Sequence, residues 1–404
     1  RSLYHVVNQY TIEDKRRSQN KMRGNMTNIN AKIKAISDEL NQEFVERHDE
    51  INGAILALLS KNHVLYLGSP GTAKSALIDT LSKKVDAANY FQWLLTKFTV
   101  PDELFGAVSL KGLENDEYRR ITTHKLPEAH IAFVDEIFKG SSAILNTLLT
   151  IVNERKFHNN GAIMTVPLIS VFGASNELPE SEDLSALYDR MGLRYVVKYI
   201  SEDAAMKAML RGTKPATSTK LTLTELIQAQ AEVAAIPVSD IILDNIITIR
   251  KHMKQEGIIV SDRRYRMSVE ILKASAWLNG NTTVTEEDMS IMVHILWAQP
   301  TEIKTVQRVV LSLVNPYLNK IIEYVDMAAE IYTVALNLVL KDASKAGAAG
   351  SEAVPKFKKI IESMAGLKLE ISKAGKDQKA IDDAIATVNS QYKEVLAKTL
   401  GLKL

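Results

Sequence analysis

The sequence predicts an α/β fold: a five-stranded, mostly parallel sheet covered by helices on both faces, followed by an all-helical region. Three observations lead to this prediction. Apolar runs of strand length alternate with helical segments as far as residue 200, which is typical of a parallel sheet with crossover helices. A glycine-rich loop joins the first of these runs to a helix. From about residue 201 onward, only helical periodicity remains.

The first half of the chain supplies the elements of this sheet. Helical spacing of apolar residues predicts helices at 28–42, 49–60, 76–85 and 141–153. Short apolar runs bounded by glycine or polar residues predict buried strands at 64–67, 91–95, 131–134, 168–174 and 194–199. Two β-like runs flank a polar turn within residues 107–123, and they predict a hairpin.

The second half reads as helices throughout. The apolar spacing predicts helices at 202–210, 222–235, 239–255, 266–279 and 285–297. A long apolar stripe then runs from Val306 to Val339, and Pro316 is expected to divide or kink it because proline cannot donate its backbone hydrogen bond. Small, flexible residues at 341–355 predict a linker. Two further helices follow, and with the preceding one they are expected to form a hairpin or bundle; they cover 356–366 and 377–399.

Composition excludes several classes of protein. Lys and Arg total 50 and Asp and Glu total 48, so the net charge of +2 lacks the basic excess of a protein that coats nucleic acid. The absence of cysteine excludes disulfides, thiolate metal sites and cysteine nucleophiles. No apolar run reaches the roughly 18 to 20 residues that cross a bilayer, and the first residues lack the order of a signal peptide. A cytoplasmic location is therefore expected.

The strongest chemical signal is a phosphate-binding loop between the strand at 64–67 and the following helix. It consists of Gly68, Ser69, Pro70, Gly71, Thr72, Ala73, Lys74 and Ser75, and it enters the helix at Ala76. Glycines allow a tight turn whose N–H groups face phosphate oxygens, and the helix adds the positive end of its dipole. Lys74 is expected to reach the β- and γ-phosphates of ATP, and the Ser75 hydroxyl to bind Mg²⁺.

Two alternatives qualify this interpretation of the loop. A glycine-rich turn can bind nothing, although the Lys-Ser ending and the flanking elements disfavour that here. The strict pattern also has glycine before the lysine, where this chain has Ala73. Alanine costs little at that position if its φ is negative, so nucleotide binding is expected to survive.

Polar residues follow two later strands. Asp135 and Glu136 end the run at 131–134, which places them at the carboxyl end of a strand, where open α/β sheets bind ligands. Asp135 is expected to hold Mg²⁺, and Glu136 to polarise the attacking water. Asn176 follows the strand at 168–174 and could orient that water. Taken alone, an asparagine there is more often a turn former or a helix cap.

Taken together, these motifs are specific: over residues 28 to 300 the chain resembles a MoxR-type AAA+ ATPase. It is nearest to the RavA (regulatory ATPase variant) subgroup. The similar stretches include FVERHDEI (44–51), LGSPGTAKSALI (67–78), KFTVPDELFG (97–106), LPEAHIAFVDEIFKGSSAILNTLLTIVNERKFHNNG (126–161), ASNELPE (174–180), LSALYDRMGLR (184–194) and SDRRY (261–265). The loop at 68–75 and Asp135-Glu136 correspond to the Walker A and Walker B motifs.

The resemblance implies roles for further residues. Asn176 matches sensor 1, and Arg190 matches the arginine finger that completes a neighbouring subunit's site. Arg263 matches the sensor 2 arginine, with the adjacent Arg264 as a competitor for that role. The segment from Val45 to His48 lies where the family's chain passes the adenine. Glu136, Asn176, Arg190 and Lys74 are thus the expected catalytic residues.

The resemblance also implies an architecture. The strand order is 5-1-4-3-2 along the sheet, and the 107–123 segment faces the pore of a ring, expected to be a hexamer. The expected divisions are an N-terminal segment and lead helix, a nucleotide-binding αβα core, an all-α lid and a C-terminal helical extension; they cover residues 1–43, 44–200, 201–300 and 301–404. Residues 1 to about 25 of the N-terminal segment are expected to be partly disordered or not native to the protein.

The implied function is chaperone-like remodelling or maturation of a protein complex, driven by Mg-ATP hydrolysis. The family's usual partner carries a von Willebrand factor A domain, which a separate subunit would have to supply. RavA proteins also carry a β-rich module among their C-terminal helices, and no such segment is visible after residue 300, so its partner is not carried over. Two alternatives remain: a nucleic-acid-dependent motor, disfavoured by the near-neutral charge, and a nucleotide-gated binding scaffold.

Overall fold

The computed structural model describes residues 28–402, except 180–181, 213–214, 216 and 376–377. The expectation for residues 1–25 therefore lies outside the described residues. The described chain divides between Val310 and Leu311 into two compact units, which are described separately. None of the described helices is long and apolar enough to cross a membrane.

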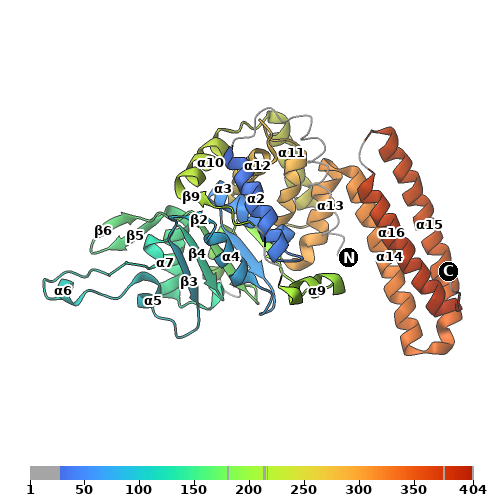
Figure 1. Ribbon diagram of the computed structural model, residues 1–404, viewed down its shortest axis with the longest axis horizontal. Helices are drawn as coiled ribbons and strands as arrows, with labels where there is room; N and C mark the ends of the chain where they lie inside the picture. The colour runs from blue at the N-terminus through green and yellow to red at the C-terminus, as the bar shows by residue number, and fades with distance from the viewer. Residues whose placement is uncertain (1–27, 180–181, 213–214, 216, 376–377, 403–404) are drawn as a thin grey trace. The chain divides into compact units, whose positions relative to one another are not determined.

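A five-stranded parallel sheet forms the centre of the first unit (Figure 1). Its order is β3-β4-β7-β1-β8, which confirms the expected order 5-1-4-3-2. The strands are β1 (Val64–Leu67), β3 (Tyr90–Leu94), β4 (Ile131–Asp135), β7 (Ser170–Ser175) and β8 (Leu193–Val196).

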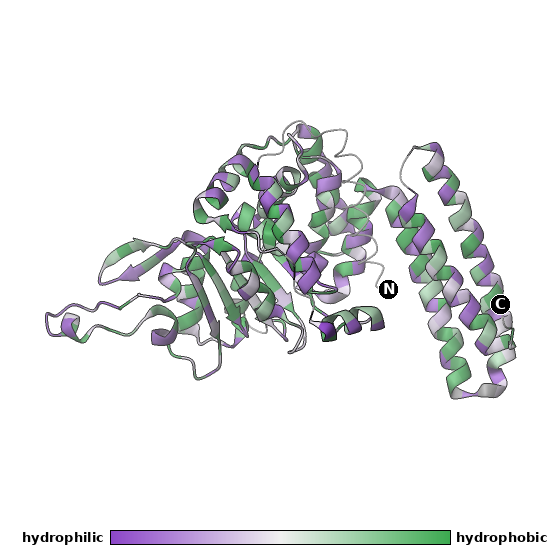
Figure 2. Cartoon of the chain, in the orientation of Figure 1, coloured by the Kyte–Doolittle hydropathy of each residue, from purple (hydrophilic) through white to green (hydrophobic). Residues whose placement is uncertain are grey.

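The central strands are buried along their length, because helices cover both faces of the sheet. All residues of β1 and β7 are buried, as are the first four of β4. These strands are strongly hydrophobic (Figure 2). The helices and turns around the sheet are α2 (Asn28–Glu43), α3 (His48–Ser60), α4 (Lys74–Ser82), α5 (Pro101–Phe105), η1 (Leu126–Glu128), η2 (Ile137–Lys139), α7 (Ser142–Glu154) and α8 (Glu182–Arg190).

The predicted hairpin at 107–123 is wrong. The segment holds one antiparallel bridge, between Val108 and Arg120, and the one-turn helix α6 (Leu110–Leu113) beyond it. The Ser109 hydroxyl accepts a hydrogen bond from the Gly112 amide at 3.1 Å, so a polar cap begins a helix where the sequence suggested a strand.

A hairpin that was not predicted follows α7. It pairs β5 (Lys156–Asn159) with β6 (Ala162–Thr165) in antiparallel register. Its two-residue turn is Asn160-Gly161, with φ of 53° and 71°. Asn-Gly with two positive φ values is the preferred two-residue hairpin turn, so a usable sequence signal was present.

Helices make up most of the rest of the first unit. They are α9 (Asp203–Arg211), α10 (Leu223–Ala235), α11 (Asp240–Gln255), α12 (Asp262–Asn279), η3 (Glu287–His294), η4 (Pro300–Glu302) and, as far as Val310, α13 (Ile303–Val314). A short parallel pair joins β2 (Val85–Asp86) to β9 (Leu221–Thr222). The α-helix expected at 285–297 is replaced by the 3₁₀ turns of η3.

Two buried side chains, those of Arg194 and Tyr188, hold the segment that follows η3. Arg194 of β8 is 2% exposed and donates from Nη1 to the Trp297 carbonyl at 2.5 Å. Its guanidinium lies 3.5 Å from the ring centre of Tyr188, a cation–π contact. The Tyr188 hydroxyl in turn donates to the Ala298 carbonyl at 2.5 Å. These bonds fasten residues 297–298 to the sheet.

The second unit is a three-helix bundle, as expected, of α14 (Pro316–Lys341), α15 (Ala346–Lys373) and α16 (Lys379–Leu400). α13 ends at Val314, Asn315 follows it, and Pro316 begins α14. The predicted division of the apolar stripe at Pro316 is therefore confirmed. The bundle core includes Phe357 and Val388, which are fully buried.

The linker predicted at 341–355 is wrong for most of its length. Only the turn η5 (Ala343–Lys345) separates α14 from α15, and residues 346–355 are helical. A Cβ on Gly350 would lie 2.5 Å from Thr399 Oγ1 of α16, and Ala349 and Ala353 are buried. The small residues therefore allow close helix packing rather than flexibility.

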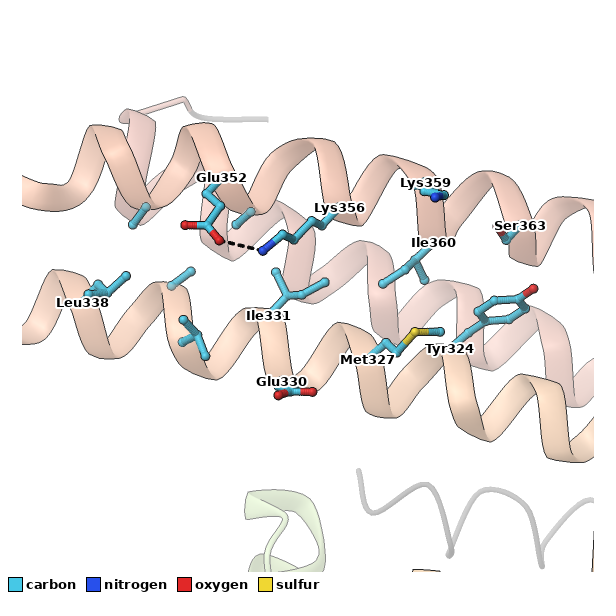
Figure 3. Close-up of a pocket in the computed structure, with 14 residues that line it drawn as sticks. Tyr324, Met327, Glu330, Ile331, Leu338, Glu352, Lys356, Lys359, Ile360 and Ser363 are labelled. Carbon is cyan, nitrogen blue, oxygen red and sulfur yellow. Dashed lines mark hydrogen bonds and ion pairs between the residues drawn. The ribbon is translucent and has the colours of Figure 1, made fainter. Parts of the chain in front are cut away.

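A cavity of about 480 Å³ lies along the bundle between α14 and α15 (Figure 3). Its lining is mainly apolar, with Ile331 and Ile360 facing each other across it. Lys356 and Glu352 form an ion pair of 2.6 Å beside it. All its lining residues belong to α14 and α15, so it is separate from the motifs that predict chemistry.

Candidate functional site

The phosphate loop connects β1 to α4 and is closely fitted to the sheet. The Gly68 amide donates to the Ser175 carbonyl of β7 at 3.0 Å. Gly68 has φ of 151°, and a Cβ there would lie 2.1 Å from the Val197 carbonyl oxygen, so no larger residue fits. Gly71 has φ of 78° with open space around its Cα, which leaves room for a ligand against the backbone.

Ala73 departs from the expectation of a negative φ. Its φ is 64° and its ψ is 21°, the left-handed conformation, at the residue that precedes α4. This conformation costs an L-residue other than glycine about 1–2 kcal/mol. The loop therefore keeps the backbone shape that glycine normally supplies, and it does so under local strain.

Replacing Ala73 with Gly is expected to raise the free energy of unfolding by about 1 kcal/mol, because glycine adopts the left-handed conformation without a steric cost. Chemical denaturation followed by circular dichroism measures the change. The matched control is Ala76→Gly, two residues into α4, which should instead destabilise by about 0.5–1 kcal/mol. A loss of stability in Ala73→Gly would contradict the strain argument.

Lys74 is folded back over its own loop. Its Nζ donates to the carbonyls of Gly68 and Ser69, both at 2.8 Å, and to Thr72 Oγ1 at 3.3 Å. Burial lowers the pKa of Lys74, and the negative charges of Asp135 and Glu136 oppose that shift. The lysine is thus held at the loop, within electrostatic reach of both acids.

The two acids lie at the end of β4. Asp135 closes the strand, and its Oδ1 accepts a hydrogen bond from the Glu136 amide at 3.0 Å. Glu136 has φ of 52°, which turns the chain sharply after the strand. Its Oε2 is shielded from solvent and forms an ion pair with Lys139 Nζ at 3.1 Å. Within the described residues this oxygen accepts no hydrogen bond.

Strand register brings these groups to one edge of the sheet. β7 lies between β4 and β1, with Val134 paired to Gly173 and Leu67 to Ser175. The carboxyl ends of the three strands are therefore adjacent, and they carry the acids, Asn176 and the phosphate loop. Asn176 is exposed. The sheet edge so assembled matches the position where open α/β sheets bind ligands.

A second cluster contains the arginines. Asp189, beside Arg190 at the end of α8, accepts bonds from Ser261 Oγ at 2.7 Å and from Arg263 Nη1 at 2.8 Å. Burial, and next the positive charge of Arg263, lower the pKa of Arg190, while Asp189 acts in the opposite direction. The structure therefore brings Arg190 and Arg263 together.

Not all hydrogen-bond donors of Arg190 have a partner within this cluster. Its Nη1 donates to the Ala186 carbonyl of the same helix at 2.7 Å. Its Nε is shielded from solvent and has no hydrogen-bond partner within the described residues. A buried donor without a partner costs about 1–3 kcal/mol, so an oxygen anion brought to it would gain that amount.

Arg264 is distinguished from Arg263 by its surroundings. It is 3% exposed, and its guanidinium donates to the carbonyls of Ile295 (2.7 Å from Nε), Met191 (2.8 Å) and Gly192 (3.1 Å). Arg263, whose side chain is 44% exposed, keeps its outer face accessible. Of the two candidates for sensor 2, only Arg263 can reach a ligand without breaking buried bonds.

The segment from Val45 to His48 joins α2 to α3. Val45 is half-buried, and Arg47 is 7% exposed and directly contacts the phosphate loop. No sequence pattern pointed to a role for Arg47. The nearest signal was the match of this segment to the family, which could not show where the guanidinium points.

The residues present fit a nucleotide with a divalent metal ion. The loop offers open backbone at Gly71 and a cation at Lys74, and the negative charge of Asp135 acts on that lysine. No group of three or more His, Asp or Glu side chains in the described residues could enclose a metal by itself. Mg²⁺ bound with a nucleotide keeps several waters and takes further ligands from the phosphates.

Comparison with known proteins identifies the family. A family model described as the MoxR domain of MoxR–vWA–β-propeller ternary systems matches residues 31–236, just over half the chain, and an AAA lid domain matches 241–310. The chain belongs to the MoxR family of AAA+ proteins. The fold class predicted from the sequence is thereby confirmed, while the nearness to RavA stays a prediction.

Relatives of this MoxR-family protein include two uncharacterized proteins of Methanocaldococcus jannaschii. One is 40% identical over 86% of this chain and 90% of its own length, the other 37% identical over 91% and 100%. A structural protein of Acidianus two-tailed virus is 30% identical, over 49% of this chain and 34% of its own.

A solved structure supports the fold. The crystal structure of a candidate ATPase from Cytophaga hutchinsonii superimposes with a TM-score of 0.56, at 18% identity, over 69% of this chain and 94% of that chain. At this identity the likeness speaks for the fold alone.

Proposed function

We propose that this MoxR-family protein binds and hydrolyses Mg-ATP as a ring-shaped oligomer, expected to be a hexamer, and uses the energy to remodel or mature a protein complex. One observation carries the proposal: the phosphate loop, Asp135, Glu136 and Asn176 converge on one edge of the parallel sheet. Each has the chemistry that phosphoryl transfer to water requires at that edge.

The residues divide the work between binding and chemistry. Backbone amides of the loop, Lys74 and the dipole of α4 would hold the β- and γ-phosphates. Ser75 and Asp135 would hold Mg²⁺, which neutralises charge on the phosphate oxygens when bound. Glu136 would accept a hydrogen bond from the attacking water, and Asn176 would orient that water. Val45 and the residues after it would border the adenine.

Arg190 is proposed to act on a neighbouring subunit's ATP, and Arg263 to act as the sensor 2 arginine of the lid. The charges of Asp135, Glu136 and Arg47 act on the pKa of Lys74, and those of Arg263 and Asp189 act on the pKa of Arg190. Lys74 and Arg190 thus each belong to a cluster of charged side chains. As the arginine finger, Arg190 would face the phosphates of an adjacent protomer, which makes assembly part of the mechanism.

A protein partner is the preferred client. The matched family model is named for systems that contain a vWA protein and a β-propeller, and the net charge of +2 gives no sign of a nucleic-acid surface. A separate von Willebrand A-domain protein is thus the expected partner of the ring.

Replacing Lys74 with Met is expected to weaken ATP binding by about 10- to 100-fold, because a hydrogen bond to a charged group contributes about 1.5–3 kcal/mol. Calorimetric titration of the assembled protein with ATP and Mg²⁺ measures the affinity. Lys83→Met is the matched control, since Lys83 is 72% exposed and pairs only at the surface with Asp79 in a 2.6 Å ion pair. Absence of any adenine-nucleotide affinity in the unaltered protein would overturn the proposed function.

A further inference from the structure

Arg47 connects the segment before α3 to the phosphate loop through three backbone carbonyls. Its Nε donates to the Thr72 carbonyl at 3.2 Å, Nη2 to the Lys198 carbonyl at 2.7 Å, and Nη1 to the Glu46 carbonyl at 2.7 Å. All three nitrogens of the guanidinium are thus engaged. A fixed planar fork of donors suits arginine to this position and lysine poorly.

The bond to Thr72 sets the orientation of one peptide plane in the loop. In a planar trans peptide, the carbonyl and the following amide point in opposite directions. With the Thr72 carbonyl held by Arg47, the amide of Ala73 points away from the Arg47 guanidinium. An amide so directed would be free to face a phosphate, as the N–H groups of a phosphate-binding loop do.

This is also the peptide that precedes the strained residue. Ala73 has φ of 64°, a conformation that an alanine keeps only when its surroundings enforce it. On its C-terminal side the Ala73 carbonyl accepts the Leu77 amide at 3.0 Å as the helix begins. Arg47 supplies the corresponding restraint on the N-terminal side. The two bonds together hold the strained residue from both ends.

Arg47 is itself held in place by its neighbour. Glu46 has φ of 55°, and its carboxylate accepts bonds from the Ser201 amide (3.0 Å), the Ser201 hydroxyl (3.1 Å) and the Glu202 amide (3.0 Å). Ser201 and Glu202 lie just ahead of α9, and Lys198 lies just after β8. Glu46 and Arg47 therefore both bind the segment that connects β8 to α9.

We propose that Arg47 is a positioning residue for the phosphate loop: by holding the Thr72 carbonyl it keeps the Ala73 amide facing the phosphates of the nucleotide. The inference rests on the proposed ATP binding. It assigns Arg47 no contact with ATP and no part in the chemical step. Its loss should weaken the binding of ground state and transition state alike, which raises KM and leaves kcat unchanged.

The test uses Arg47→Lys in the full-length assembled protein, with ATP and Mg²⁺. We expect KM for ATP to rise about tenfold while kcat stays within about twofold. The second half of the test adds Ala73→Gly, which removes the strain that Arg47 opposes. Arg47→Lys should therefore raise KM less in the Ala73→Gly background than in the unaltered protein, so the double variant is compared with Ala73→Gly alone.

Several outcomes would overturn the positioning role. They are unchanged KM in Arg47→Lys, a fall confined to kcat, or strictly additive effects of the two substitutions. A loss of affinity in Arg47→Gln but not in Arg47→Lys would show that charge alone matters, and would also reject it. Failure of the unaltered protein to bind ATP rejects the proposed function and this inference together, whereas normal binding with an indifferent Arg47 rejects only the inference.

A milder variant keeps the test decisive if Arg47→Lys does not fold. Glu46→Gln leaves the Arg47 side chain intact but weakens the bonds to Ser201 and Glu202 that hold its segment. We expect KM to rise about threefold, and again by less in the Ala73→Gly background. Unchanged KM in Glu46→Gln, or an equal rise in both backgrounds, would count against the proposal in that case.

Discussion

Arg190→Ala is expected to lower the ATP hydrolysis rate of the assembled protein by about 10³-fold or more, with ATP still bound. A guanidinium supplied to the transferring phosphoryl group by a neighbour contributes that much to the rate in P-loop NTPases. Arg190 is suited to this role because its buried Nε has no partner within the described chain. Phosphate release in a steady-state assay measures the rate, and calorimetry measures retained binding.

Mixing subunits tests whether Arg190 acts on a neighbour. Arg190→Ala subunits keep an intact phosphate loop, and Lys74→Met subunits keep an intact Arg190. Each variant alone should be nearly inactive, but mixed rings contain sites in which both groups are unaltered, so hydrolysis should reappear. Arg266→Ala serves as control, because Arg266 is 80% exposed and pairs within its own helix with Glu270. No recovery on mixing would reject action in trans.

Glu136→Gln is expected to reduce hydrolysis by about 10²–10⁴-fold, which is the usual contribution of a group that accepts a proton from the attacking water. ATP affinity should be retained, since the amide keeps the shape of the carboxylate and the phosphate loop is unaltered. Single-turnover hydrolysis and ATP binding are the measurements. The control is Glu154→Gln, at an exposed glutamate that faces Lys156 at 3.4 Å. Hydrolysis at the original rate would contradict the role of Glu136.

The same variant tests the proposed client. A ring that holds ATP without hydrolysing it should assemble but fail to release its partner, so affinity capture in ATP should retain that partner. Recovery of a von Willebrand A-type protein would support the remodelling function. Recovery of nucleic acid alone would reject it in favour of a motor, and full function with no turnover would favour a nucleotide-gated scaffold.

The sheet could be predicted because its information is local. Each central strand is a continuous apolar run, and such runs are distinctive when both faces of a sheet are covered. All of β1 is buried, for instance, and the run at 64–67 was visible as sequence. The carboxyl-end position of Asp135 and Glu136 follows from the same run, since a polar pair directly after a buried strand can only lie at its end.

Other features depend on contacts between distant residues. The left-handed φ of Ala73 needs anchors on both sides, one of which, Arg47, is 26 residues away along the chain. The small residues around Gly350 look like a linker by composition, yet they form a helix because Thr399 packs against them. Arg263 and Arg264 are adjacent and chemically identical, and only burial separates their roles.

The buried arginines constrain how the subunit can move. Arg264 of α12 holds carbonyls on the sheet side of the first unit, while Arg194 of β8 holds Trp297 from the opposite direction. Swinging the start of α12 outward would forfeit several such bonds at about 1.5–3 kcal/mol each. These bonds should therefore keep the start of α12 fixed to the sheet side of the first unit during nucleotide turnover.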